Sequence, residues 1–131
     1  MTGVLLDSTA VIDILRSRPG AVARLQQLYR QGDDPYTCAI VADEVSVAVL
    51  PRERDAAGTL FEGLFEAPLG IAEGRLAGWW RREHRRRGRT LHASDCLIAA
   101  AAVGVSVRLA TGNPKDFPMT GLVVEHWPVN E

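Results

Sequence analysis

Acidic side chains occupy positions in this sequence from which they could share one cation. Asp7 directly follows the apolar run VLL, and Asp116 follows the stretch SVRLA after a short loop. Each apolar stretch predicts a buried strand, and in parallel sheets ligands bind beyond the carboxyl ends of the strands. Both carboxylates are therefore predicted at that edge, where Asp7 also precedes a helix N-terminus whose dipole favours an ionised carboxylate.

Two further acids lie in helical patterns. Asp95 is the second residue of the segment SDCLIAAAA, whose apolar residues lie nearly all round a helix, and Glu44 is flanked at helical spacing by aliphatic residues. A carboxylate on a packed face is costly unless it has a donor or a cation beside it. Other interpretations stay open: Glu44 at the surface, Asp95 bonded to first-turn amides, and Asp116 as the third residue of a turn capped by Asn113.

The kind of cation follows from the donor atoms. Carboxylates that converge without basic partners repel one another unless a divalent ion neutralises them, and oxygen ligands suit Mg²⁺ or Mn²⁺ rather than zinc. The three histidines, His84, His92 and His126, show no metal-binding spacing. Neither a phosphate-binding P-loop nor the GxSxG motif of serine hydrolases is present in the sequence.

The elements that must position these acids alternate along the chain. Strands are predicted at residues 3–7, 35–40, 106–111 and 121–127, and helices at 10–17, 21–32, 41–50, 53–66, 71–87 and 93–104. Ser8 or Thr9 is the expected cap of the first helix. Alternating strands and helices predict an α/β fold with a parallel sheet covered on both faces.

Composition predicts a single globular domain over residues 1–131. The chain is 47% hydrophobic and 24% charged, and no apolar run approaches the length of a membrane helix. The N-terminus lacks the basic and apolar regions of a secretory signal. Cys38 and Cys96 form no metal motif, so they are interpreted as reduced thiols of a cytoplasmic protein.

Four segments of the sequence together resemble a known family. VLLDSTAVID, IVADEV, SDCLIAAAA and LATGNPKDF are similar to the motif blocks of PIN-domain nucleases, and their order and spacing match the VapC-type toxins of bacterial toxin–antitoxin pairs. The resemblance covers essentially the whole chain. It implies a three-layer α/β/α sandwich with a short central parallel sheet, a homodimer, and a cognate antitoxin that blocks an acidic pocket.

The resemblance also implies an activity and a role for each acid. The activity would be metal-dependent endoribonuclease cleavage, in which water activated by Mg²⁺ or Mn²⁺ hydrolyses RNA phosphodiesters. Asp7 and Asp95 would be the principal metal ligands, Glu44 would complete the catalytic pocket, and Asp116 would act directly or through water. Ser8 or Thr9, and Thr111, match positions that orient these acids. Many relatives carry an acid where this chain has Asn113, which makes a second strongly held metal less certain.

A basic block provides a candidate surface for the RNA. Residues 75–92 carry a net charge of +6 within a chain whose net charge is −1. Basic residues four apart on a helix lie on one face, so Arg81, Arg82, Arg85 and Arg86 are predicted to form a ridge that binds RNA phosphates. The alternative is a solvated helix face whose neighbours Trp79 and Trp80 pack in the core or in a dimer interface.

Two rival functions were weighed against the nuclease. A degenerate PIN domain that binds RNA or a partner protein without cleavage is the main alternative, and Asn113 is the feature in its favour. Phosphatases with an aspartate nucleophile also place an acid after the first strand, but they need a second one two residues later, where this chain has Thr9.

Overall fold

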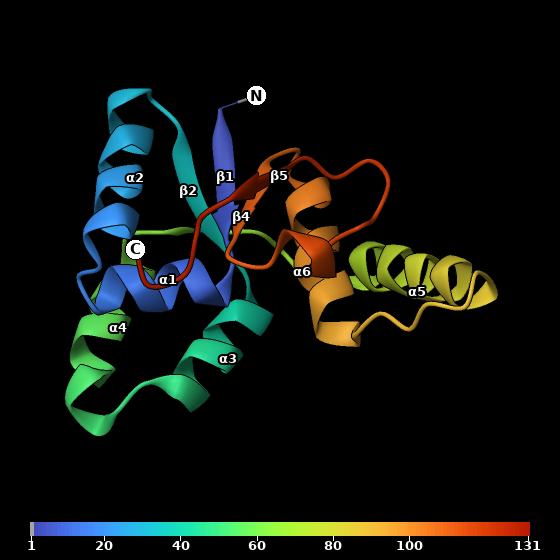
Figure 1. The fold of residues 1–131 in the computed structure, drawn as a ribbon, viewed down its shortest axis with the longest axis horizontal. Coiled ribbons are helices and arrows are strands. Elements are labelled where there is room, and N and C mark those ends of the chain that lie inside the picture. The colour runs from blue at the N-terminus through green and yellow to red at the C-terminus, as the bar shows by residue number, and fades with distance from the viewer. Residues whose placement is uncertain (1) are drawn as a thin grey trace.

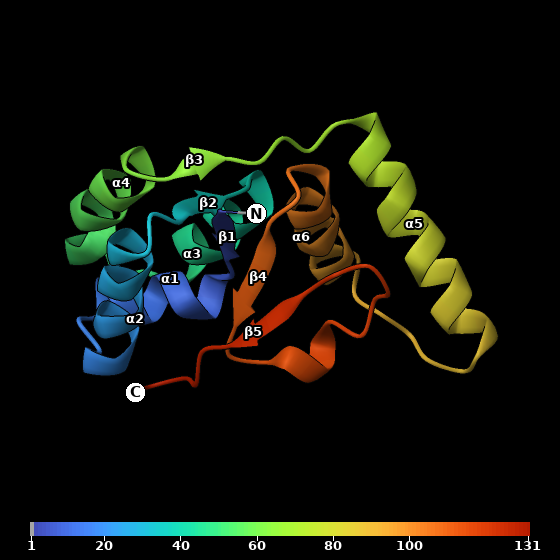
Figure 2. The same ribbon diagram turned by 90° about the horizontal axis from the view of Figure 1, so that it is seen from above.

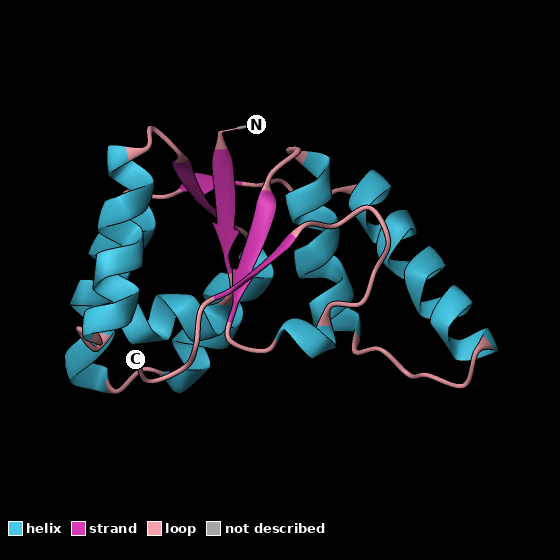
Figure 3. Ribbon diagram, turned by 45° about the horizontal axis from the view of Figure 1, so that its top comes forward, coloured by secondary structure: helices cyan, strands magenta, loops and turns pink. Residues whose placement is uncertain are grey.

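The computed structural model describes residues 2–131 and has one central parallel sheet (Figure 1). The strand order is β3-β2-β1-β4-β5, and every neighbouring pair is parallel. The strands are β1 (Gly3–Leu6), β2 (Asp34–Thr37), β3 (Phe65–Glu66), β4 (Arg108–Thr111) and β5 (Val124–His126). The arrowheads of β1 and β4 point toward the same end of the sheet, so residues that follow these strands meet there (Figure 3).

Helices cover the sheet on both sides. They are α1 (Ser8–Leu15), α2 (Pro19–Arg30), α3 (Ala39–Ala48), α4 (Arg54–Glu62), α5 (Ile71–Arg86) and α6 (Ala93–Gly104), with short 3₁₀ turns η1 (Pro51–Glu53) and η2 (Pro114–Asp116). Figure 2 shows α5 and α6 on one side of the sheet and α1, α2 and α4 on the other. The three-layer α/β/α prediction is confirmed. Within residues 2–131, no helix has the length and apolar character needed to cross a membrane.

The core explains why β1 and α6 are the most apolar segments. All four residues of β1 are buried, because this strand is central in the sheet and covered on both faces. On α6, Ile98 and the four alanines that follow it are fully buried. Small side chains let this helix lie close to the sheet, and its first turn therefore reaches the edge where the strands end.

Two local predictions are wrong. Residues 53–66 were expected to form one helix, but α4 ends at Glu62 and Phe65–Glu66 form β3 against β2. Gly63 caps the helix, and the ring of Phe65 then lies 5.5 Å from that of Tyr36 across the strand pair. The cap of α1 is Asp7 rather than Ser8 or Thr9, since an Asp7 carboxylate oxygen accepts the Ser8 amide at 2.7 Å.

Candidate active site

Asp7 is held rigidly between the ends of β1 and β4. Its side chain is 5% exposed, with Oδ1 accepting the Ser8 amide and Oδ2 accepting the Thr111 hydroxyl, both at 2.7 Å. Burial raises the pKa of Asp7, and the two donors partly offset this by stabilising the charged form. The charge of Asp116 adds to the rise in pKa, which places Asp116 close by.

Hydroxyl groups also fix the loop that carries Asp116. The Gly112 amide donates to the Thr9 hydroxyl at 2.9 Å, and the Asn113 amide donates to the Thr111 hydroxyl at 3.1 Å. These bonds tie the end of β4 to the start of α1 and direct the chain into η2. Thr111 and Ser8 thus bond directly to Asp7, whereas Thr9 bonds to the backbone of the loop that leads to Asp116.

Asp95 lies in the first turn of α6, at the same edge of the sheet (Figure 1). Its half-buried side chain has a pKa raised to about 6, mainly by burial and then by the charges of Asp7, Asp116 and Glu44. The charge of His92, the N-cap of this helix, lowers the pKa of Asp95. Asp95 is thus within electrostatic reach of all three other predicted acids.

Glu44 completes the group from α3. The pKa of Glu44 is raised, and burial is the main cause. A hydrogen bond with Ser8 lowers it, and the charges of Asp7 and Asp43 raise it further. Asp43 itself is exposed, as helical spacing predicts for the neighbour of a half-buried residue. Within residues 2–131, neither Glu44, Asp95 nor Asp116 pairs with a basic side chain.

The donor set suits a hard divalent cation in type. Its members are carboxylates without an ion-pair partner, and their charges raise the pKa of Asp7, Glu44 and Asp95, so such a group gains most from a bound cation. Within residues 2–131, however, no three Asp, Glu, His or Cys side chains converge closely enough to hold a metal ion without moving. Asp7 is fixed by its hydrogen bonds, whereas Glu44, Asp95 and Asp116 are half-buried.

Two basic side chains lie beside the acids. A cavity of about 100 Å³ is lined by Asp95 and Asp116 together with Arg89 and His92. The Arg89 guanidinium donates to the Lys115 carbonyl, which holds the loop before α6 against η2. Neither residue stands out in the sequence, because Arg89 belongs to the basic block and His92 lacks metal-binding spacing. Both residues lie within six positions of Asp95 in the sequence, and this proximity could have identified them as neighbours of the acidic site.

The predicted arginine ridge lies elsewhere. Arg82, Arg85 and Arg86 are exposed on α5, and Arg86 lies 3.6 Å from Glu83. Arg81 is half-buried, and its Nε has no hydrogen-bond partner within residues 2–131. None of the four lines the cavity that contains Asp95 and Asp116. The end of α5 that carries them is at the outer edge of the molecule (Figure 2).

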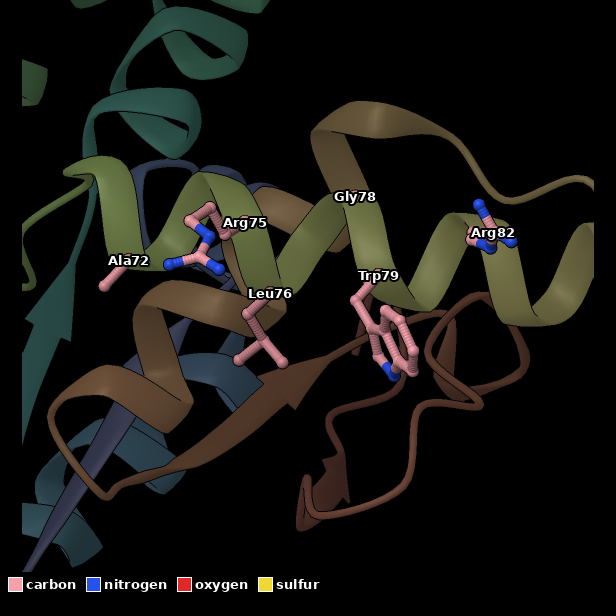
Figure 4. A pocket seen from close by; sticks show the side chains of 6 residues that line it. All are labelled: Ala72, Arg75, Leu76, Gly78, Trp79 and Arg82. Atoms are coloured by element: carbon pink, nitrogen blue, oxygen red, sulfur yellow. The ribbon is translucent and has the colours of Figure 1, made fainter.

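The tryptophans of α5 face opposite environments. Trp80 is 5% exposed and packs in the core, whereas Trp79 is 60% exposed, so the prediction that both pack holds within the chain only for Trp80. Trp79 borders a hollow of about 600 Å³ along α5. Figure 4 shows Leu76 and Trp79 pointing to the same side of the helix there, with Arg75 and Arg82 beside them.

Comparisons with known proteins agree with this geometry. The sequence profile of the PIN domain matches residues 4–118. Ribonuclease VapC19 of Mycobacterium tuberculosis is 30% identical over 115 residues, which is 88% of this chain and 92% of that protein. The fold matches a chain of VapBC2 from Rickettsia felis bound to a promoter DNA fragment, with a TM-score of 0.81, 20% identity and coverage of 96% and 99% of the two chains. VapBC-1 from nontypeable Haemophilus influenzae gives a TM-score of 0.80, 21% identity and coverage of 96% and 98%.

Proposed function

This chain belongs to the PIN-domain family, and we propose that its residues 1–131 act as a single nuclease domain, a metal-dependent endoribonuclease that serves as the toxin of a toxin–antitoxin pair. The observation that carries the proposal is the gathering of four carboxylates at one edge of the sheet, where the charges of Asp7, Asp116 and Glu44 all raise the pKa of Asp95. The name of the relative VapC19 supports RNA as the substrate.

Each acid has a distinct part in the proposed reaction. Asp7 and Asp95 would hold Mg²⁺ or Mn²⁺, Asp116 would join them directly or through water, and Glu44 would complete the acidic pocket. When bound, the cation supplies a lowered pKa for water and neutralises charge on the phosphate. Thr111 and the Ser8 amide orient Asp7 and partly offset the rise in its pKa. Arg89, beside Asp95 and Asp116, attracts the RNA phosphate into a region that is otherwise negative.

The direct test is cleavage of total RNA by purified protein freed of any bound partner. Discrete fragments are expected with Mg²⁺ or Mn²⁺ and none with EDTA, and the products should carry 5′-phosphate and 3′-hydroxyl ends. Cyclic 2′,3′-phosphate ends would contradict attack by activated water. Retained RNA binding without any cleavage would favour the degenerate PIN domain instead.

The exposed arginines of α5 are proposed to contact RNA phosphates outside the acidic pocket. In EDTA, which prevents cleavage, Arg85→Ala/Arg86→Ala should weaken RNA binding. It should also reduce the slope of log K against log salt by about 1.4, since each lost phosphate contact on a single strand accounts for about 0.7. Arg52→Ala/Arg54→Ala, which removes two exposed arginines from η1 and α4, is the control. An unchanged slope for Arg85→Ala/Arg86→Ala would mean that these arginines face solvent and do not contact RNA.

The proposed partner of the toxin is a cognate antitoxin protein. The matched solved structures are complexes of the VapBC type, which supports such a partner for this chain. An antitoxin that covers the acidic edge would keep RNA away from it. We place this pair in the cytoplasm, where the buried free thiols of Cys38 and Cys96 would stay reduced.

We further propose that the exposed face of α5 forms a homodimer interface. Trp79 is 60% exposed and Ile71 is 84% exposed, and apolar surface of this kind marks interaction sites. Light scattering should give the mass of a dimer for the unchanged chain and a shift toward the monomer for Trp79→Ala. Phe65→Ala, which removes an aromatic ring that is 54% exposed on β3, should leave the mass unchanged. A monomer for the unchanged chain would overturn this interface.

A further inference from the structure

A second cavity lies at the same edge of the sheet as the acids. Its volume is about 300 Å³, at the lower end of pockets that take small ligands. It lies where β2 ends and α3 begins, and residues at the end of α4 and in β3 close its other side. The side chains of Ala42, Phe61 and Leu64 give it an apolar wall.

Two polar side chains of this cavity, those of Thr37 and Glu66, have no side-chain partner within residues 2–131. Thr37 is 7% exposed, and its hydroxyl has no hydrogen-bond partner within residues 2–131. A buried hydroxyl without a hydrogen-bond partner is unfavourable, so this group is suited to a ligand that supplies a hydrogen-bonding atom. The exposed carboxylate of Glu66, also in the lining, forms no ion pair in the described part of the chain.

The cavity adjoins the acidic site. Ala39 and Ala42 of α3 line it, and Glu44 lies two residues after Ala42 on the same helix. A chain bound with one phosphate at the acids could therefore place a neighbouring group in this cavity without crossing the protein.

We propose that this cavity binds a guanine base of the RNA, next to the phosphate that is cut. The inference rests on the proposed ribonuclease function. Proteins read single-stranded RNA by placing unstacked bases against aromatic or apolar side chains and hydrogen-bonding their edges. Phe61 and Leu64 supply the apolar wall for the base.

Guanine fits the polar groups of the cavity better than the other bases do. Its pairing edge carries two adjacent N–H donors and one carbonyl acceptor. The Glu66 carboxylate accepts both donors, and the Thr37 hydroxyl donates to the carbonyl. Adenine, cytosine and uracil each lack one of the two adjacent donors, so they would leave part of the carboxylate unsatisfied.

Titration with the four nucleoside 5′-monophosphates tests the proposal without cleavage. The unchanged chain is used in EDTA, and binding is followed by calorimetry. Guanosine monophosphate should bind about tenfold more tightly than the others, because a bidentate contact discriminates bases by about this factor. Since the phosphate is common to all four probes, the difference reports the base alone.

Three variants locate the preference. Thr37→Val, which keeps the side-chain shape, and Glu66→Gln should each reduce the preference for guanosine monophosphate to about twofold or less. Glu62→Gln, an exposed α4 residue outside the cavity lining, should retain it. Equal binding of all four nucleotides, or a preference that survives both changes, would overturn the proposal. RNA cleavage by the same preparation is scored separately, so loss of the nuclease function and loss of the base site give different results.

Discussion

Replacing Asp7 with asparagine should lower the rate of RNA cleavage on the order of 10³-fold, the upper range for loss of one charge-stabilising group in an active site. Asparagine keeps the shape of the side chain but removes the buried charge and one of its acceptor oxygens. The bonds from the Ser8 amide and the Thr111 hydroxyl, both 2.7 Å, can then no longer both be kept. The rate is measured under single-turnover conditions with Mn²⁺ in excess.

The chain offers a matched control for this change. Asp13 lies on the same helix as the cap residue Asp7, is also 5% exposed, and accepts the Asn130 amide at 2.8 Å, a bond that asparagine can keep. Asp13→Asn should therefore leave cleavage within about twofold of the unchanged chain. If Asp7→Asn cuts RNA as fast as Asp13→Asn, the acidic site is not where the chemistry occurs.

Replacing Asp95 with asparagine should abolish cleavage and yet stabilise the cation-free protein at neutral pH. The pKa of Asp95 is raised from 3.8 to about 6 in the folded chain. Between about pH 4 and pH 6 the folded chain keeps a proton that the unfolded chain releases, so this residue makes stability fall as pH rises through that window. A shift of about two pKa units corresponds to about 3 kcal/mol, which solvent at the half-buried side chain reduces to about 1 kcal/mol.

Thermal unfolding in EDTA measures this effect. At pH 7, Asp95→Asn should unfold ~3 °C above the unchanged chain, and at pH 3.5 the difference should vanish. Mg²⁺ at ten times its dissociation constant should stabilise the unchanged chain by about 1.4 kcal/mol. The unchanged chain should then unfold at a higher temperature than Asp95→Asn. Asp43→Asn, which changes the exposed neighbour of Glu44, should unfold at the same temperature as the unchanged chain both in EDTA and with Mg²⁺. A lower unfolding temperature for Asp95→Asn than for the unchanged chain at pH 7 would contradict a destabilising charge at Asp95.

The parts of this fold that follow from sequence are those with strong local patterns. The strand at Gly3–Leu6 and the helix at Ala93–Gly104 were predictable because nearly continuous apolar runs mark elements buried on all sides. The edge that gathers the acids was predictable because parallel strands end together. Asp7 and Asp116 therefore followed from strand positions, while Glu44 and Asp95 also needed helical spacing.

The remaining features depend on contacts between distant segments. β3 has two residues, and pairing with β2 rather than a sequence pattern defines it. Arg89 reaches the acids because its guanidinium bonds the Lys115 carbonyl, 26 positions along the chain. Trp79 and Trp80 are adjacent, identical residues, and only the placement of α5 against α6 decides which is buried. The Thr37 hydroxyl could not be recognised as unpartnered before the cavity around it was known.

Binding of Mn²⁺ tests most directly whether Asp7, Glu44, Asp95 and Asp116 act as one cation site. Electron paramagnetic resonance of free Mn²⁺ during a titration counts the ions that the protein removes from solution. The unchanged chain should bind Mn²⁺ saturably at pH 7. Asp7→Asn and Asp95→Asn should each weaken binding by about tenfold or more, whereas Asp13→Asn should not. Absence of saturable binding by the unchanged chain, or equal binding by all four proteins, would contradict the account.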